Sequence, residues 1–210
     1  MLRILFSEVD KSVRRPAIFI DRDGVINLLR PSDYVLDWSQ FVFVPGIREA
    51  LKQLASLGLP MIVISNQAAV GKGLLDTAGL EEITSKMYQE LAHDGTFLTA
   101  AYYCPHRPDE NCPCRKPKPA LLHAAAADFN IDLTRSVFIG DSDTDVEAAH
   151  GAGCKPVLFG IGVRAVSDSS ACKTEVPVAR TTQDLFTVVS TGLSRGEPPK
   201  LGSRQVTYRS

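Results

Sequence analysis

The chain has 210 residues, of which 44% are hydrophobic and 22% are charged, and its formal net charge is −1. This length suits one domain with a sizeable core, and the near-neutral charge excludes a general electrostatic attraction to nucleic acid or to an anionic membrane. No apolar run approaches the roughly 20 residues of a transmembrane helix, and the short apolar start, residues 1–6, lacks the features of a signal peptide.

Short apolar runs that suit buried strands alternate with stretches of helical apolar spacing. A short run of β-branched and aromatic residues predicts a buried strand, and apolar residues three or four positions apart predict a helix. In chain order we expect a strand at 17–20, a helix at 47–57, a strand at 61–64, a helix at 80–91, a strand at 100–103, a helix at 119–129, a strand at 137–140, a helix through Val146 and Ala149, and a strand at 156–159.

This alternation predicts an α/β fold, a Rossmann-like open parallel sheet with helices on both faces. We assign residues 1–15 to an N-terminal extension and residues 16–190 to the domain itself. Residues 191–210 are expected to form a flexible tail, because the chain from Arg195 onward is polar and rich in proline and glycine. The segments between the strands are too short for a separate cap domain.

Polar residues follow three of the expected strands. Asp21 and Asp23 come directly after the first strand, Ser65 follows the second, and Asp141 follows the strand at 137–140. In open α/β sheets ligands bind beyond the carboxyl ends of the strands, where these side chains should meet. Crowded carboxylates repel each other unless a cation lies among them, and Mg²⁺ suits one or two carboxylates together with a substrate phosphate. We therefore expect Mg²⁺ at Asp21, Asp23 and Asp141.

The same strand ends supply groups for phosphate chemistry. The Ser65 hydroxyl, backbone N–H groups near Asn66 and the Lys116 ammonium can bind phosphoryl oxygens. With that charge neutralised, Asp21 can attack phosphorus as a nucleophile, and Asp23 can protonate the leaving alkoxide and later activate water. These residues predict a phosphomonoester hydrolase that works through an aspartyl-phosphate.

Four segments resemble the motifs of the haloacid dehalogenase-like superfamily: Asp21-Arg22-Asp23-Gly24-Val25, Ser65-Asn66-Gln67, Lys116, and Gly140-Asp141-x-x-x-Asp145. The resemblance implies the same catalytic residues that the chemistry suggests, namely Asp21, Asp23, Ser65 and Lys116. It implies Asp141 as a Mg²⁺ ligand and Asp23 as a ligand through its backbone carbonyl. Asp145 would support the site indirectly.

A cysteine-rich loop lies directly before Lys116. Its metal-binding residues form two close pairs, Cys104-x-His106 and Cys112-x-Cys114. Three thiols and one imidazole make a closed tetrahedral Zn²⁺ site of the structural type, which leaves no open position for substrate. A loop of free thiols and a catalytic zinc are the alternatives.

This loop also bears on the substrate. It would hold Arg115 and Lys116 over the phosphate site, with Lys118 as the competing candidate for the phosphate lysine. The run Cys-Pro-His…Cys-x-Cys-Arg-Lys-Pro looks like one branch of the superfamily, which holds heptose-1,7-bisphosphate 7-phosphatases and histidinol-phosphate phosphatases. Residues 66–73 resemble the first group, which favours removal of the 7-phosphate of a heptose 1,7-bisphosphate, with Asn66, Gln67 and Arg115 in contact with substrate. Residues 31–34 resemble the second group and keep histidinol phosphate as the alternative.

Two other classes of protein are the alternatives to an enzyme. The complete set of acids argues against a catalytically inactive zinc-stabilised binding module, and the near-neutral charge without a basic stripe argues against a nucleic-acid-binding protein. We therefore expect a cytoplasmic monomer whose partner is a small phosphorylated metabolite, with no nucleic acid and no membrane. Loops at 28–36, 67–74 and 105–116 are expected to set its specificity.

Overall fold

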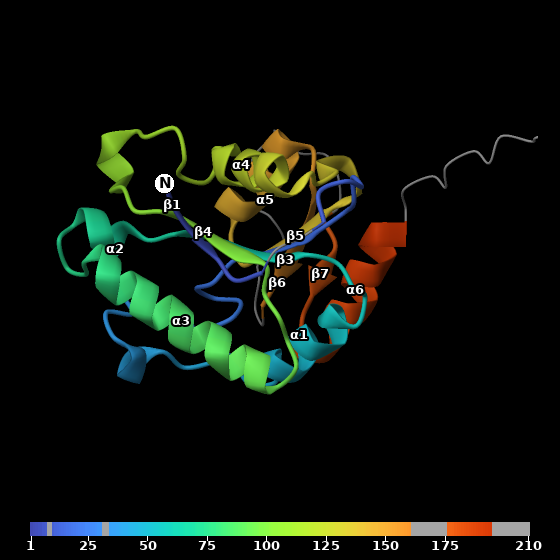
Figure 1. Cartoon of the computed structure of the whole chain (residues 1–210), viewed down its shortest axis with the longest axis horizontal. Coiled ribbons are helices and arrows are strands. Elements are labelled where there is room, and N and C mark those ends of the chain that lie inside the picture. The colour runs from blue at the N-terminus through green and yellow to red at the C-terminus, as the bar shows by residue number, and fades with distance from the viewer. Residues whose placement is uncertain (8–9, 31–33, 161–175, 195–210) are drawn as a thin grey trace, which may run out of the picture.

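The computed structural model describes residues 1–7, 10–30, 34–160 and 176–194. Its centre is a seven-stranded sheet of order β1-β4-β3-β2-β5-β6-β7, in which every neighbouring pair is parallel except β1 with β4 (Figure 1). The strands are β1 (Leu2–Leu5), β2 (Ile18–Ile20), β3 (Met61–Asn66), β4 (Ala100–Cys104), β5 (Val137–Gly140), β6 (Lys155–Phe159) and β7 (Val178–Ala179).

Helices cover both faces of this sheet, as the alternation of elements predicts. Figure 1 shows α4 (Ala120–Phe129) and α5 (Asp143–Ala152) on one face. The other face carries α1 (Ile47–Ala55), α3 (Thr77–His93) and α6 (Thr182–Ser194). A short helix, α2 (Ala68–Gly71), follows β3 directly. The fold class expected from the sequence is confirmed.

The central strands are apolar throughout because both of their faces are buried. In β2, Ile18 and Ile20 pack into the core under α1 and α3, whereas Phe19 packs into the core under α4 and α5. Phe19 is paired with Ile62 of β3 on one side and with Phe138 of β5 on the other. Alternate residues of a strand point to opposite faces, so a strand with two cores reads as a continuous apolar run.

The structure adds elements at both ends of the chain that the sequence did not predict. Residues 1–15, assigned to an extension, contain the edge strand β1, which pairs antiparallel with β4 through Leu2 opposite Tyr103. β7 and α6 lie beyond residue 160, where no element was expected, and α6 runs past residue 190 to Ser194. Residues 191–194 of the expected tail, 191–210, therefore belong to this helix, and residues 195–210 lie outside the described residues.

Two further observations concern the size of the elements. Among the described residues, the segments between β2 and β3 and between β3 and β4 pack as loops and helices against the sheet, without a separate cap domain. No helix among the same residues has the length and apolar character that crossing a membrane would need.

Candidate active site

Three carboxylates meet at the carboxyl edge of the sheet. Asp21 follows β2, Asp141 follows β5, and Asp145 lies in the first turn of α5. One oxygen from each of the three lies within 4.8 Å of the others. The parallel pairing of β2 with β5 brings the two strand ends together, and the Asp21 N–H donates to the Ile139 carbonyl at 2.8 Å. Of the side chains that were expected to gather here, Asp21 and Asp141 lie in this cluster, and Asp145 is added to them.

Lys116 inserts its ammonium group into this cluster. Its Nζ atom lies 2.9 Å from Oδ1 of Asp21 and 2.7 Å from Oδ1 of Asp145, and it donates to the Ile64 carbonyl at 3.1 Å. Only 4% of Lys116 is exposed. Lys118 lies elsewhere, because its Nζ donates to the carbonyls of Asn111 and Cys112. Of the two candidate lysines, the structure brings Lys116 to the carboxylates.

The electrostatics of the cluster favour a bound cation. Burial raises the pKa of Asp21 to about 7, an effect that Lys116 opposes and that Asp145 and Asp141 reinforce. Burial, followed by the charge of Asp145, raises the pKa of Asp141 to about 6. Three carboxylates beside one ammonium group leave a formal excess of two negative charges. A divalent cation with oxygen ligands matches both the charge and the donor set.

Gly24 lets the loop after β2 pack against Asp141. Its φ is +86°, and a Cβ atom built on it would lie 1.9 Å from Oδ2 of Asp141. Any other residue would displace that carboxylate and would also strain the backbone. The glycine of the Asp-x-Asp-Gly segment is therefore required by the close approach of two strand ends.

Asp23 is not one of the clustered carboxylates, and its side chain accepts hydrogen bonds from several donors. Its Oδ1 accepts from Arg22 Nη2 at 2.9 Å and from Asn27 Nδ2 at 2.9 Å, and its Oδ2 accepts from Gln67 Nε2 at 2.7 Å. Burial alone would raise the pKa of Asp23, but the charge of Arg22 and the hydrogen bonds hold it below its ordinary value. The sequence did not predict these roles of Arg22 and Asn27. Both side chains are buried against Asp23, and nothing in the sequence distinguishes such residues from exposed polar ones.

The two amides after Ser65 are both used inside the protein. Asn66 forms two hydrogen bonds with the backbone of Lys116. Its Oδ1 accepts from Lys116 N at 3.1 Å, and its Nδ2 donates to Lys116 O at 3.2 Å. Gln67 Nε2 donates to Ser65 Oγ at 3.1 Å as well as to Asp23. Both side chains were expected to touch substrate; in the structure Asn66 holds Lys116, and Gln67 connects Ser65 to Asp23.

The cysteine-rich loop forms a compact four-ligand cluster at the end of β4. The Sγ of Cys104 lies 3.5 Å from that of Cys112, and the Sγ of Cys112 lies 3.7 Å from that of Cys114. His106 Nδ1 lies 3.5 Å from Cys104 Sγ and 3.3 Å from Cys114 Sγ. A tetrahedral zinc with bonds of about 2.3 Å would set neighbouring sulfurs about 3.8 Å apart, whereas a disulfide would set them about 2.05 Å apart. The residues fit a zinc ion.

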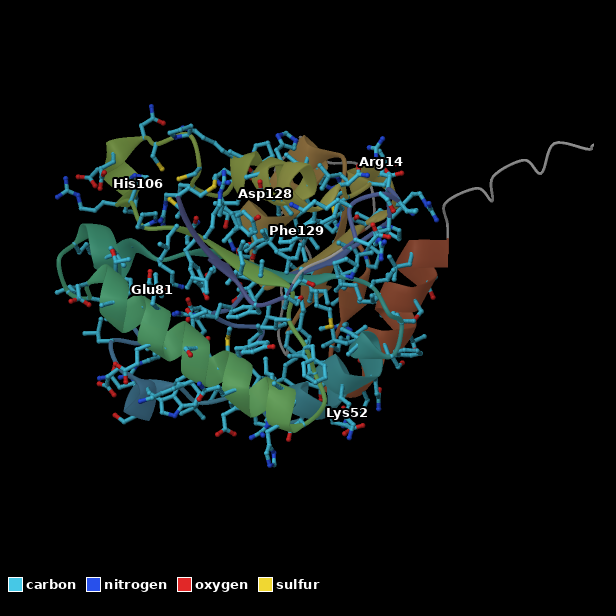
Figure 2. The ribbon with its side chains drawn as sticks, viewed as in Figure 1. Arg14, Lys52, Glu81, His106, Asp128 and Phe129 are labelled. Carbon is cyan, nitrogen blue, oxygen red and sulfur yellow. The ribbon has the colours of Figure 1, made fainter. Side chains whose placement is uncertain are left out.

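This zinc-loop segment, residues 104–116, packs against both ends of α2. Gln67 N donates to the Cys104 carbonyl at 2.7 Å, and Gly71 N donates to the Pro105 carbonyl at 2.8 Å. A Cβ atom on Gly71 would lie 2.7 Å from that same carbonyl oxygen. Figure 2 labels His106 in this loop, at the end of the molecule where Figure 1 places α2. Arg115 belongs to the same unit, because its Nη1 donates to the His106 carbonyl at 3.3 Å.

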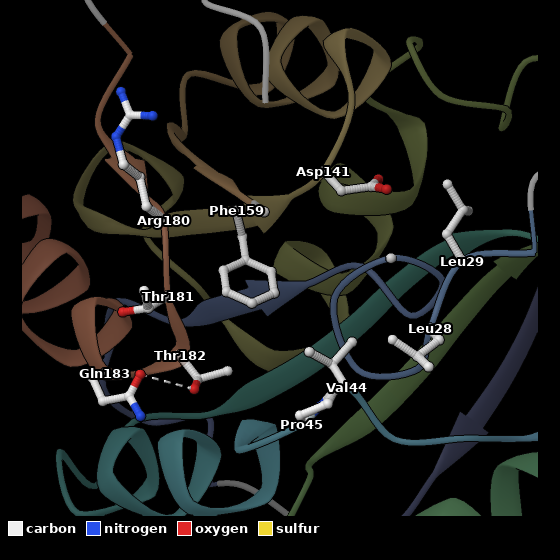
Figure 3. A pocket seen from close by; sticks show the side chains of 12 residues that line it. Leu28, Leu29, Val44, Pro45, Asp141, Phe159, Arg180, Thr181, Thr182 and Gln183 are labelled. Carbon is white, nitrogen blue, oxygen red and sulfur yellow. Dashed lines mark hydrogen bonds between the residues drawn. The ribbon is translucent and has the colours of Figure 1, made fainter. Parts of the chain in front are cut away.

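A cavity of about 740 Å³ lies beside Asp141. Its wall is formed by the loop after Gly24 with Leu28 and Leu29, by the end of β6 and by the turn between β7 and α6 (Figure 3). The cavity therefore adjoins the cluster at Asp141, next to the first of the loops that were expected to set specificity.

Comparison with known proteins places this site in a family. A family model described as HAD-hydrolase-like matches residues 113–185. The D-glycero-beta-D-manno-heptose-1,7-bisphosphate 7-phosphatase of Pseudomonas aeruginosa is 38% identical over 152 residues, which cover 71% of this chain and 85% of that protein. The Pseudomonas putida protein of the same name is 40% identical over 146 residues, covering 69% of this chain and 82% of that one.

A solved structure agrees with these relatives. The D,D-heptose 1,7-bisphosphate phosphatase from B. bronchiseptica, complexed with magnesium and phosphate, superposes with a TM-score of 0.75 at 32% identity, covering 87% of this chain and 99% of that one. Fold and site together define a phosphatase of the haloacid dehalogenase-like hydrolases. Within that class, the chain belongs to the family that contains the D-glycero-beta-D-manno-heptose-1,7-bisphosphate 7-phosphatases.

Proposed function

We propose that this enzyme removes the 7-phosphate of a heptose 1,7-bisphosphate through an aspartyl-phosphate on Asp21. The observation that carries the proposal is the position of Asp21, which is buried beside Lys116 and two further carboxylates at the sheet edge. The substrate follows from the relatives, which bear this activity in their names and match most of their length to this chain.

The proposed reaction has two steps. In the first, a carboxylate oxygen of Asp21 forms a bond to phosphorus while the bond from phosphorus to the sugar oxygen breaks, and Asp23 gives that oxygen a proton. In the second, Asp23 takes a proton from water as the water oxygen attacks phosphorus, which frees Asp21 and inorganic phosphate. Ser65 and Lys116 bind the phosphoryl oxygens, on which the charge of the transition state is spread.

The carboxylate cluster is the proposed Mg²⁺ site. Asp21 and Asp141 would hold the ion with their side chains and Asp23 with its backbone carbonyl. Asp145 has a different proposed task, because its carboxylate is paired with Lys116 at 2.7 Å and accepts from Ser142 Oγ at 2.6 Å. When bound, Mg²⁺ would offset the negative charge of the phosphoryl group that faces these acids.

The four residues of the zinc loop are the proposed structural Zn²⁺ site. Cys104, His106, Cys112 and Cys114 would fill a tetrahedral shell and leave no position for substrate. The loop runs directly into Arg115 and Lys116, so its shape sets where these two cations lie. Zinc would therefore serve catalysis by fixing the loop rather than by contacting the reacting atoms.

Arg115 is the proposed contact for the part of the substrate that does not react. One of its N–H groups is engaged by the His106 carbonyl. A guanidinium carries five N–H hydrogens in a planar fork, which suits a second phosphate or sugar hydroxyls. Asn66 is proposed to act through Lys116, whose backbone it holds. That the enzyme works as a cytoplasmic monomer stays a prediction from the sequence.

A substrate panel tests this function. Phosphate release should be measured with and without Mg²⁺ for the heptose 1,7-bisphosphate, histidinol phosphate and a simple alkyl phosphate. We expect Mg²⁺-dependent turnover and the highest kcat/KM for the bisphosphate. A higher kcat/KM for histidinol phosphate would replace the substrate and keep the mechanism. No release from any of the three would overturn the proposed function.

A further inference from the structure

The Asp23 carboxylate is surrounded by donors from three different residues. Arg22 contributes its Nη2 to both oxygens, at 2.9 and 3.0 Å, and Asn27 Nδ2 and Gln67 Nε2 each contribute one hydrogen bond. Arg22 and Asn27 lie on the same loop as Asp23, so they move with it. Gln67 is different, because it comes from the end of the neighbouring strand and ties the Asp23 loop to a separate element.

Gln67 is itself held firmly in place. Its backbone N–H donates to the Cys104 carbonyl at 2.7 Å, and its carbonyl accepts from Val70 N at 3.2 Å. Only 3% of the residue is exposed. Its side-chain nitrogen lies 2.7 Å from Asp23 Oδ2 and 3.1 Å from Ser65 Oγ, so both amide hydrogens have partners. The Gln67 side chain therefore has no remaining N–H hydrogen to donate to a sugar substrate.

Gln67 connects two residues, Ser65 and Asp23, that have proposed roles in the reaction. Ser65 is the proposed phosphate-binding hydroxyl, and Asp23 is the proposed acid and base. Because Ser65 Oγ accepts from Gln67, its own O–H hydrogen remains available to donate to a phosphoryl oxygen. One amide nitrogen therefore sets both the direction of the serine hydroxyl and the place of the carboxylate that must reach the same phosphoester.

We propose that Gln67 is a positioning residue, which holds the Asp23 carboxylate at a fixed place relative to the phosphate-binding hydroxyl of Ser65. The inference rests on the proposed function and deepens it. Glutamine suits this task because a glutamate of equal size would place a second carboxylate against Asp23. An asparagine, one carbon shorter, would not span from the backbone of residue 67 to both partners.

A double-mutant cycle tests the proposal. Gln67→Leu in the wild-type enzyme should lower kcat about tenfold or more, without exceeding the roughly 10²–10⁴-fold effect of losing the acid and base itself. KM should change little. In an Asp23→Asn background the same Gln67→Leu change should lower kcat by less than about twofold, because residues that act through one another are not additive.

Two further variants serve as controls for the Gln67→Leu experiment. Gln67→Glu keeps the size and polarity of the side chain and should lose activity as Gln67→Leu does, and thermal unfolding of each variant establishes that it is folded. Asn66→Ala is the matched control, because Asn66 acts on Lys116. Asn66→Ala should lower kcat by the same factor in the wild-type and Asp23→Asn backgrounds. If both Asn66→Ala and Gln67→Leu lost their effect in the Asp23→Asn background, the cause would be a general defect at this strand end.

The outcomes separate this inference from the proposed substrate. The cycle is measured on an alkyl phosphomonoester as well as on the heptose bisphosphate, so a wrong sugar leaves it intact. Equal losses of kcat from Gln67→Leu in both backgrounds would overturn the positioning role. A raised KM with unchanged kcat would also overturn it, since that result would indicate direct substrate binding.

Discussion

The ammonium nitrogen of Lys116 lies 2.9 Å from Oδ1 of Asp21, with both side chains buried at the carboxyl edge of the sheet. The carboxylates of Asp21 and Asp145 more than offset the burial of this lysine, so its pKa is raised and it stays charged at neutral pH. A permanent positive charge is therefore placed beside the proposed nucleophile, where the phosphoryl oxygens would arrive.

Replacing Lys116 should damage catalysis more than folding. Lys116→Met keeps the length of the side chain and removes its charge, and we expect kcat to fall about 10²–10³-fold, as for loss of one group that stabilises the transition state. Lys118→Met is the matched control, and its fall in kcat should be far smaller, because the Lys118 Nζ donates to the Asn111 and Cys112 carbonyls and to Asn111 Oδ1 rather than to the clustered carboxylates. Steady-state kinetics on a small phosphate ester compares the two, and similar losses would contradict the assignment of Lys116.

The two aspartates after β2 should differ in which step they affect. Asp21→Asn removes the nucleophile and should abolish turnover, while Asp23→Asn should still form some phosphoenzyme, slowly. The loss in Asp23→Asn should be about 10²–10⁴-fold and largest for esters with poor leaving groups. Rapid-quench measurement of the first turnover checks this difference. An Asp21→Asn enzyme with substantial activity would remove Asp21 from its proposed role.

Removing one zinc-loop ligand should act through the position of the neighbouring cations. Cys112→Ser is expected to lower the thermal midpoint and to lower kcat, because residues 104–116 lose the metal that organises them. Added Mg²⁺ should not restore activity. Metal analysis of the purified protein should find about one zinc per chain, following the four-ligand site. Full activity in protein free of zinc would show that this loop needs no metal.

Much of this fold was predictable from the sequence for one physical reason. β2, β3 and β5 are buried on both faces, so they read as continuous apolar runs that end abruptly at polar residues. β1 was not predicted, because it is a four-residue edge strand with alternating, half-buried side chains. Such a short alternating pattern does not differ from that of an irregular segment.

The residues of the site were predictable by type, but the direction of their side chains was not. Asp21, Asp141 and Lys116 meet because of where their strands and loop end. Asn66 and Gln67 were expected to contact the substrate, and the sequence did not predict that both would also hydrogen-bond to other site residues. The partners of these amides are distant in sequence, and which partner an amide chooses depends on tertiary packing.

Arg115 should affect the choice of substrate more than the chemistry. Arg115→Ala should lower kcat/KM for the heptose bisphosphate much more than for a small alkyl phosphate, because only the larger substrate offers a second phosphate to the guanidinium. Lys116→Ala should lower both values by a similar factor, since every substrate shares the reacting phosphoryl group. The ratio of the two kcat/KM values is unaffected by partial loss of folded enzyme. Equal losses for both substrates in Arg115→Ala would contradict a substrate-reading role.

The covalent intermediate on Asp21 can be trapped directly. Enzyme in the presence of Mg²⁺ and heptose 1,7-bisphosphate is quenched during turnover and treated with borohydride, which reduces an acyl phosphate of aspartate to homoserine. Mass spectrometry of the peptide that contains residue 21 then locates the change. We predict homoserine at position 21, dependent on substrate and absent in Asp21→Asn. Turnover without modification at Asp21, or with modification at Asp141 instead, would contradict the account.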